Sequence, residues 1–258
     1  MPPAAMNVVD RIAHTNRWSC RHPGEKLLLG GGLLLFGITL PVIPGALLIL
    51  VAAISATVLA AQVRFCEYFR LLLAPIGFLL ISAVALAVSV KMDAGAPWVS
   101  VSMHSAAAAA EVSVRALAAM ASLLLIVLTT PLTNLLAQLQ RLRLPAPILE
   151  VTLMMYRFVT LTMGVAEGTR LAQANRLGYS GGRRSIRSTG MLAATLLPRV
   201  LDRARRMETG LAARCYTGEL RTLSSPRPLS PRFVAAALAL HVVIVAASLS
   251  WHIAEPLW

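Results

Sequence analysis

Five long apolar runs limit what this chain can fold into more than any other feature of its sequence. The apolar core of a bilayer is about 30 Å thick and takes roughly 20 helical residues to cross. The hydrophobic fraction of 57% and the mean hydropathy of +0.71 exceed those of ordinary soluble domains. The sequence therefore predicts an all-α integral membrane protein with about five transmembrane helices, at Leu27–Leu40, Gly45–Val63, Leu71–Val90, a fourth run that ends at Thr129, and Phe233–Trp251.

The first two apolar runs are predicted to form a tight hairpin. The segment Pro41–Gly45 separates them, and its two prolines and glycine break a helix. The first arm is short for a span, so we expect it either to tilt little or to begin before Lys26. Gly30–Gly32 are expected to let a neighbouring helix approach closely. Upstream, Val8–Thr15 is predicted to be either an interfacial helix or a frayed terminus.

Basic residues are distributed very unevenly along the chain. The formal net charge is +13, from 24 lysines and arginines against 11 carboxylates. If the N-terminus is cytoplasmic, only Lys91 and Arg115 fall in the outer segment, where we expect Arg115 to pair with Glu111. This positive-inside pattern predicts a multi-pass protein of a bacterial inner membrane with a cytoplasmic N-terminus. Topology explains the charge, and no basic platform interleaved with aromatic residues favours nucleic acid.

The chain is predicted to have three parts. Residues 1–131 hold the first four transmembrane helices, residues 132–231 form a cytoplasmic domain of amphipathic helices, and residues 232–258 form the last transmembrane helix. In the middle part we predict helices at Leu132–Leu142, Ile148–Gly178 and Met191–Leu223, with a basic loop at residues 180–190. Ile148–Gly178 is apolar in its first half. A span is unfavourable there, because an arginine such as Arg157 costs about 2.5–3.5 kcal/mol near the centre of a span.

Met191–Leu223 is the most basic and amphipathic stretch of the chain. At 100° per residue its apolar stripe consists of Ala193, Leu197, Val200, Ala204, Met207 and Leu211. The adjacent stripe holds Arg199, Arg203 and Arg206, with Arg214 at its border. The sequence allows two alternative binding partners for this basic face. Anionic lipid headgroups attract each arginine by about 1 kcal/mol, and an acidic cleft on a soluble partner suits the planar guanidinium group.

Metal-binding and catalytic patterns are not evident in the sequence. The five histidines and three cysteines lack the spacings of zinc or paired-thiol sites. No nucleotide-binding motif is present, so we expect no cofactor and no enzymatic activity in this chain. His241 lies inside the last apolar run, where a hydrogen bond between helices is a simpler explanation than a functional role.

Several short motifs, in order along the chain, resemble one protein family. They are Asp10-Arg11 with His14 and Asn16, Thr129-Thr130-Pro131, Tyr156-Arg157-Phe158 with Glu167, and the stretch from Arg199 to Gly218. Their order and spacing resemble the transmembrane T component of energy-coupling factor (ECF) transporters, of the cobalt/nickel type called CbiQ.

The resemblance implies a coupling role for two helices. T components contact cytoplasmic ABC ATPases through two coupling helices, each ending in a short Ala-Arg-Gly-like motif whose arginine touches the ATPase. The second motif matches Ala213-Arg214-Cys215, with cysteine in place of glycine. The first is matched by Arg176, within Ala174–Gly178. The remaining candidate ATPase contacts are Arg199, Arg203 and Arg206.

The resemblance also implies what the partners bind. CbiO-like ATPases would hold ATP and magnesium, and a CbiM-like membrane subunit would hold cobalt or nickel. A small CbiN-like subunit is a further candidate partner, and lipid surrounds the spans. Two alternatives stay open: a T component of a vitamin importer, and a membrane scaffold that binds anionic lipid without any transport role.

Overall fold

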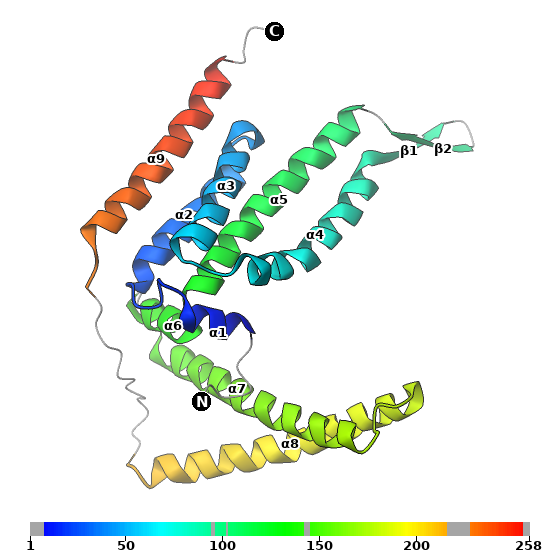
Figure 1. Cartoon of the computed structure of the whole chain (residues 1–258), viewed down its shortest axis with the longest axis vertical. Coiled ribbons are helices and arrows are strands. Elements are labelled where there is room, and N and C mark those ends of the chain that lie inside the picture. Colours follow the sequence, from blue (N-terminus) through cyan, green and yellow to red (C-terminus); the bar gives the residue numbers. More distant parts are fainter. Residues whose placement is uncertain (1–7, 94–95, 102, 142–144, 216–227, 255–258) are drawn as a thin grey trace. The chain divides into compact units, whose positions relative to one another are not determined.

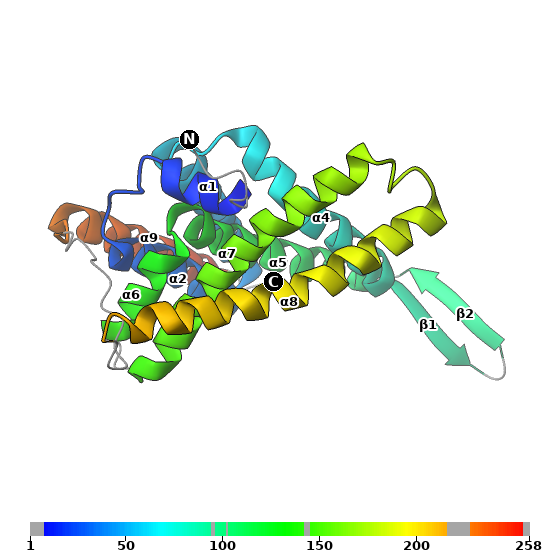
Figure 2. The ribbon, with the colours of Figure 1, turned by 90° about the horizontal axis from the view of Figure 1, so that it is seen from below.

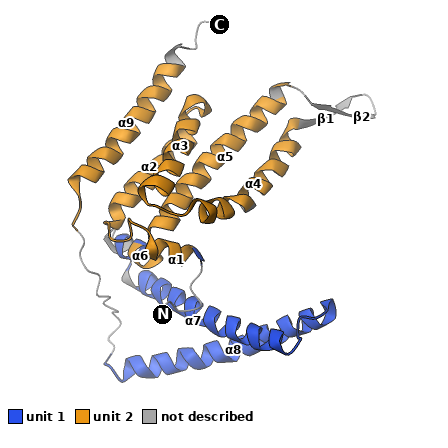
Figure 3. Cartoon of the chain, viewed as in Figure 1, with its two compact units in different colours: residues 1–8, 135–225 blue, residues 9–134, 226–258 orange. Residues whose placement is uncertain are grey.

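A computed structural model describes residues 8–93, 96–101, 103–141, 145–215 and 228–254 of the chain. Figure 1 shows its elements and Figure 2 shows the same ribbon from below. The chain divides into two compact units, which Figure 3 colours separately. We call residues 9–134 with 226–258 the membrane unit, and residues 1–8 with 135–225 the basic unit.

The membrane unit is helical apart from one pair of strands. Its helices are α1 (Val8–Thr15), α2 (Pro23–Thr39), α3 (Leu47–Ser55), α4 (Phe65–Ala87), α5 (Met103–Thr129) and α9 (Pro231–Ala254), and wide helical turns at Val42–Ala46 and Ala56–Ala60 flank α3. Helix α5 lies at the centre and packs against α2, α3 and α4, while α9 packs against α2. The inner face of α5 is made of small and apolar side chains that are almost completely buried: Ala118, Ala121, Leu125 and Leu128.

The expected all-α class is confirmed, and so are most of the expected spans. Among the described residues, four helical segments are long and apolar enough to cross a membrane, and α4 makes a fifth if its two halves, bent by 40° at Pro75, count as one span. The four are Val42–Ala60, Ser105–Thr129, Pro147–Asn175 and Pro231–Trp251. The set differs from the predicted one at two places: α2 is too short for it, and Pro147–Asn175 in the basic unit qualifies by length and composition.

The first two apolar runs form the predicted hairpin. Helix α2 begins at Pro23, so it starts before Lys26, as one of the two expectations had it. The chain breaks after Leu40, and Ile43 has non-helical backbone angles of φ −110° and ψ 119°. At this tip Arg115 does not pair with Glu111 as predicted, and instead donates to the backbone oxygen of Leu40 at 3.4 Å. The last carbonyls of a helix have no partner within it, and Arg115 supplies a donor to the one at Leu40.

The three consecutive glycines of α2 serve two different neighbours. A methyl group added to Gly30 would collide with Ile126 of α5, and one added to Gly32 would collide with the ring of His241 on α9. A methyl group on Gly31 would meet nothing within 4 Å. The predicted close approach is therefore confirmed at the first and third glycine.

Two short strands connect α4 to α5. Strands β1 (Val88–Asp93) and β2 (Ala96–Val101) pair antiparallel, with Val88 opposite Val101. The predicted span Leu71–Val90 therefore ends too late, because the helix stops at Ala87 and strand β1 begins at Val88. The alternation of valine with serine in this segment is the period-two pattern of a strand, and that signal was available in the sequence.

The basic unit consists mainly of two long helices. They are α7 (Ala146–Asn175) and α8 (Gly182–Ala212), and they follow α6 (Leu132–Arg141). The predicted loop at residues 180–190 is wrong, because α8 already begins at Gly182 with the bond from the Ser185 amide to the Gly181 oxygen, at 2.8 Å. Helix α8 also ends before the predicted Leu223, and residues 216–223 lie outside the described part of the chain.

Candidate functional site

Helix α7 ends in a complete C-terminal capping motif. The Leu177 amide donates to the Ala174 oxygen at 2.9 Å, and the Gly178 amide donates to the Gln173 oxygen, also at 2.9 Å. Leu177 has φ 57°, in the left-handed region. These two bonds around one left-handed residue define the Schellman motif. Arg176 is the residue directly before the left-handed position, and its side chain is exposed.

Helix α8 also ends at a left-handed residue, within a similar turn. The Arg214 amide donates to the Leu211 oxygen at 3.0 Å and the Cys215 amide donates to the Ala212 oxygen at 3.1 Å. Cys215 has φ 54°, although a residue with a Cβ pays about 1–2 kcal/mol in this conformation. Ala213, Arg214 and Cys215 are all exposed. Cysteine thus adopts the backbone conformation that glycine would supply in the resembling motif.

The shared backbone aligns Arg176 with Arg214. Each arginine donates its amide to the oxygen three residues earlier, Gln173 in one helix and Leu211 in the other. Each is followed by a left-handed residue. Sequence comparison alone left the register of the first motif open, whereas the backbone matches Asn175-Arg176-Leu177 to Ala213-Arg214-Cys215.

The two helices cross and contact each other along their middle sections (Figure 2). Arg199 donates from Nη1 to the Thr169 hydroxyl at 3.1 Å. Beside this bond is a largely apolar groove of about 360 Å³, lined among others by Val165 on α7 and by Leu196 and Val200 on α8. The hairpin therefore has a defined packing interface as well as two similar ends.

The predicted apolar stripe of α8 is only partly the packed face. Val200, Met207 and Leu211 are half-buried, as predicted. Leu197 and Ala204 are exposed, Leu197 by 65%. The face of α8 that packs is shifted from the predicted apolar stripe toward the arginine stripe. Arginine allows this shift, because its aliphatic stem packs beside apolar groups while its guanidinium group stays in water.

Four arginines come together in a second groove between the same helices, of about 260 Å³. They are Arg157 on α7, Arg203 and Arg206 on α8, and Arg214 in the turn that follows α8. In the described part of the chain, the one carboxylate that pairs with any of them is that of Asp202, 3.8 Å from Arg206, and both of these side chains are mostly exposed. Sequence reasoning treated Arg157 as an obstacle to membrane insertion and as part of the Tyr156-Arg157-Phe158 motif, and gave it no place among the site residues. A charge interrupting the apolar half of a long helix was the signal that could have placed it here.

Side chains from two other segments cap the C-terminal end of α5. The amide of Asn16 donates from Nδ2 to the Leu128 oxygen at 2.8 Å, and Lys26 donates from Nζ to the Thr129 oxygen at 2.7 Å. Asn16 and Lys26 are both buried. The last carbonyls of a helix have no partner within it, and a lysine also interacts favourably with the helix dipole there. The end of α5 is therefore fixed where the chain enters the basic unit.

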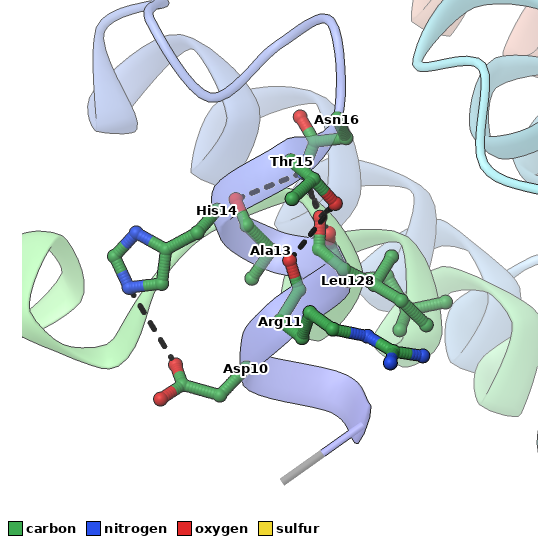
Figure 4. A network of polar contacts seen from close by, with 8 residues as sticks. Asp10, Arg11, Ala13, His14, Thr15, Asn16 and Leu128 are labelled. Atoms are coloured by element: carbon green, nitrogen blue, oxygen red, sulfur yellow. Dashed lines mark hydrogen bonds and ion pairs between the residues drawn. The ribbon is translucent and has the colours of Figure 1, made fainter. Parts of the chain in front are cut away.

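The resembling motif near the N-terminus attaches α1 to the membrane unit. Besides Asn16, Arg11 contributes an ion pair to Glu67 at the start of α4, with 3.4 Å between Nη2 and Oε1. Asp10 and His14 lie 3.8 Å apart within α1 (Figure 4). The residues of this motif thus have structural partners in α4 and α5.

The hydrogen bond predicted between His241 and another helix is not formed. Its Nδ1 bonds the Ala237 oxygen of its own helix, and Nε2 has no hydrogen-bond partner within the described residues. The ring packs against Phe36, with 5.4 Å between ring centroids. Over the same described ranges, no group of three or more His, Cys, Asp or Glu side chains is arranged to hold a metal ion.

Comparison with known proteins identifies the family. Residues 15–225 match the profile of a family described as cobalt transport protein, CbiQ. This chain belongs to the CbiQ family of cobalt transport proteins. The matched range contains both capped helix ends and the arginine groove.

Two relatives match most of the chain, and a third matches part of it. The cobalt transport protein CbiQ of Rhodobacter capsulatus is 40% identical over 239 residues, covering 93% of this chain and 96% of the relative. CbiQ of Salmonella typhimurium is 28% identical over 225 residues, covering 83% and 99%. A protein of Methanocorpusculum labreanum, named as a fused cobalt transport protein CbiMQ, is 32% identical over 97 residues, or 38% of this chain and 16% of the relative.

Proposed function

We propose that this chain is the transmembrane coupling subunit of an ECF-type ABC importer for cobalt or nickel. The observation that carries this proposal is the pair of long helices with matching ends. Each presents an exposed arginine, Arg176 or Arg214, before a left-handed residue. One coupling helix for each of two ATPases requires two such ends.

The proposed mechanism uses the helix hairpin to transmit motion. ATP binding draws the two ATPases together and displaces the ends of α7 and α8, with Arg176 and Arg214 as the contacts. Arg199, Arg203 and Arg206 extend the basic surface behind Arg214. Because α7 and α8 contact each other, the displacement is passed to the substrate-binding subunit as a shift between two packed arrangements.

All chemistry in this mechanism belongs to the partners. ATP and magnesium are bound by CbiO-like ATPases, and cobalt or nickel is cargo of a CbiM-like subunit, with a CbiN-like subunit as a further member. The relative named as a fusion CbiMQ supports the CbiM-type partner. The complex would lie in the inner membrane of a bacterium with the N-terminus of this chain in the cytoplasm, as its basic residues favour.

Charge reversal at the helix ends tests the proposal. The chain is expressed with its ATPase and substrate subunits, and both co-purification and ATP-dependent uptake of radioactive cobalt are measured. Arg214→Glu and Arg176→Glu should each reduce ATPase retention by at least about tenfold, since breaking one charged contact costs about 2–5 kcal/mol. The control is Arg187→Glu, which reverses an exposed arginine in the first half of α8.

Two results would contradict the proposal. If Arg214→Glu retains the ATPases and supports normal uptake, the helix ends are not the docking contacts. If unlabelled riboflavin, thiamine or biotin competes with uptake while nickel and cobalt do not, the cargo is a vitamin.

A further inference from the structure

The two grooves between α7 and α8 form one continuous surface with chemically different ends. Leu161, Arg203 and Arg206 line both grooves, so the grooves adjoin. The first groove is lined by the apolar side chains of Leu161, Val165, Leu196 and Val200, and also by Thr162 and the three arginines Arg199, Arg203 and Arg206. The second adds Arg157 and Arg214. An apolar trough therefore leads directly into a cluster of guanidinium groups.

The arginine cluster lacks enough negative charge of its own. Arg157 and Arg203 have no ion pair to any carboxylate in the described chain, and Arg206 has only the solvent-exposed Asp202, at 3.8 Å. Arg157 also interrupts the apolar half of α7, a segment apolar enough to enter a membrane. Several positive charges gathered in a groove with low-dielectric walls attract anions and raise their local concentration.

We propose that this groove binds one anionic phospholipid, with the phosphate among Arg157, Arg203 and Arg206 and an acyl chain along the apolar trough. Guanidinium groups bind phosphate oxygens in pairs of parallel hydrogen bonds. Leu161 lies at the junction of the two grooves, where the glycerol backbone would pass. The lipid would neutralise the cluster and fill the space between the two helices.

A lipid fits this surface better than an acidic peptide does. Helix α7, one wall of the groove, contains Pro147–Asn175, a segment that is long and apolar enough to enter a bilayer, and its polarity suits a lipid. A purely acidic segment would satisfy the arginines and leave the apolar trough exposed to water. A phospholipid matches both parts of the surface, because its charged headgroup can lie among the arginines while the attached acyl chain lies in the apolar trough.

Lipid exchange tests this proposal independently of ATPase docking. The full-length protein is placed in nanodiscs of phosphatidylcholine with or without phosphatidylglycerol, and lipid retained after extraction is counted by native mass spectrometry. Wild type should retain one phosphatidylglycerol. Arg157→Gln with Arg203→Gln should weaken that retention about thirtyfold, as expected for two charge contacts. Arg187→Gln with Arg205→Gln removes the same charge from α8 outside the groove and should retain the lipid.

Each other outcome overturns the lipid assignment. Equal retention by the two double variants would mean that any arginine suffices and that no built site exists. Protection of the protein against heat by inorganic phosphate alone, equal to that by phosphatidylglycerol, would make the groove a free-anion site. Stronger displacement of the lipid by a polyglutamate peptide than by added phosphatidylglycerol would make it a peptide site. ATPase retention is measured on Arg157→Gln alone, because Arg157 lines the groove and is not among the proposed ATPase contacts. Loss of lipid with the ATPase retained in that variant separates this site from the coupling contacts.

Discussion

Adjacent glycines in α2 are under very different steric limits. A methyl group on Gly32 would collide with the ring of His241, whereas one on Gly31 would meet nothing within 4 Å. We expect Gly32→Ala to lower the free energy of unfolding by about 1–3 kcal/mol, because overpacking forces helices apart. Thermal unfolding in detergent measures the effect. Gly31→Ala is the matched control and should raise the free energy of unfolding by about 0.5–1 kcal/mol, since alanine favours a helix over glycine. Gly32→Ala with His241→Ala should recover most of the loss.

Cys215 illustrates a residue whose backbone conformation matters more than its side chain. Its φ of 54° favours glycine. Cys215→Gly should therefore raise the free energy of unfolding of α8's end by about 1 kcal/mol, since it removes a left-handed strain of about 1–2 kcal/mol at some cost in chain entropy. Hydrogen exchange of the last turn of α8 checks this.

The neighbouring residue provides the control for that prediction. Ala213 has φ −64°, an ordinary right-handed value. Ala213→Gly should weaken the same turn by about 0.5–1 kcal/mol. If both glycine substitutions loosen the turn, the left-handed conformation at residue 215 is not what limits its stability.

At the scale of elements, α5 depends on caps from outside itself. Lys26 is 1% exposed and donates to the Thr129 oxygen. Lys26→Met keeps much of the side-chain volume but leaves that carbonyl without its donor, which should cost about 1–3 kcal/mol. The melting temperature of the detergent-solubilised protein is the readout. Arg17→Met, at an exposed arginine of the same segment, should leave it unchanged, and a melting temperature for Lys26→Met equal to wild type would show that the cap is dispensable.

The sequence was informative about most elements because their signals are local. Length and hydropathy located α5 and α9, and prolines located the break after α2. The strands at Val88–Val101 were missed because their short alternation lies between two stronger helical runs. The start of α8 was missed because its glycines and serines suggested a loop. The turn before α8 is in fact short and ends at Gly181, and the helix begins at the next residue.

The candidate site was only partly predictable for a different reason. The sequence motif singled out Arg214. It also indicated Arg176, but it did not fix how the residues around Arg176 align with the motif. The backbone angles at Leu177 and Cys215, which no local sequence pattern reports, favour one register for it. The position of Arg157 opposite Arg203 depends on how α7 and α8 cross, and periodicity within one helix contains no information about its partner.

For the whole molecule, the three cysteines offer a direct test of topology. Cys20, Cys66 and Cys215 are all unpaired and exposed, and the charge pattern assigns all three to the cytoplasm. A membrane-impermeant maleimide should therefore label none of them in intact cells and should label them in inverted vesicles. Ser100→Cys, in β2 on the expected outer side, should show the reverse. Labelling of native cysteines from outside would contradict the orientation.

The short hairpin of α2 and α3 has a consequence for the surrounding lipid. At 1.5 Å per residue, the 17 residues of α2 span about 25 Å, against about 40 Å for the 27 residues of α5. Leu35 and Ile38 near its end are 64% and 55% exposed, and the charged group of Arg115 lies at its tip. The apolar core of a bilayer is about 30 Å thick, so acyl chains beside this hairpin must compress to match it. The protein should consequently prefer thinner membranes, and a local depression of the leaflet at the tip of this hairpin would accompany it wherever it is inserted.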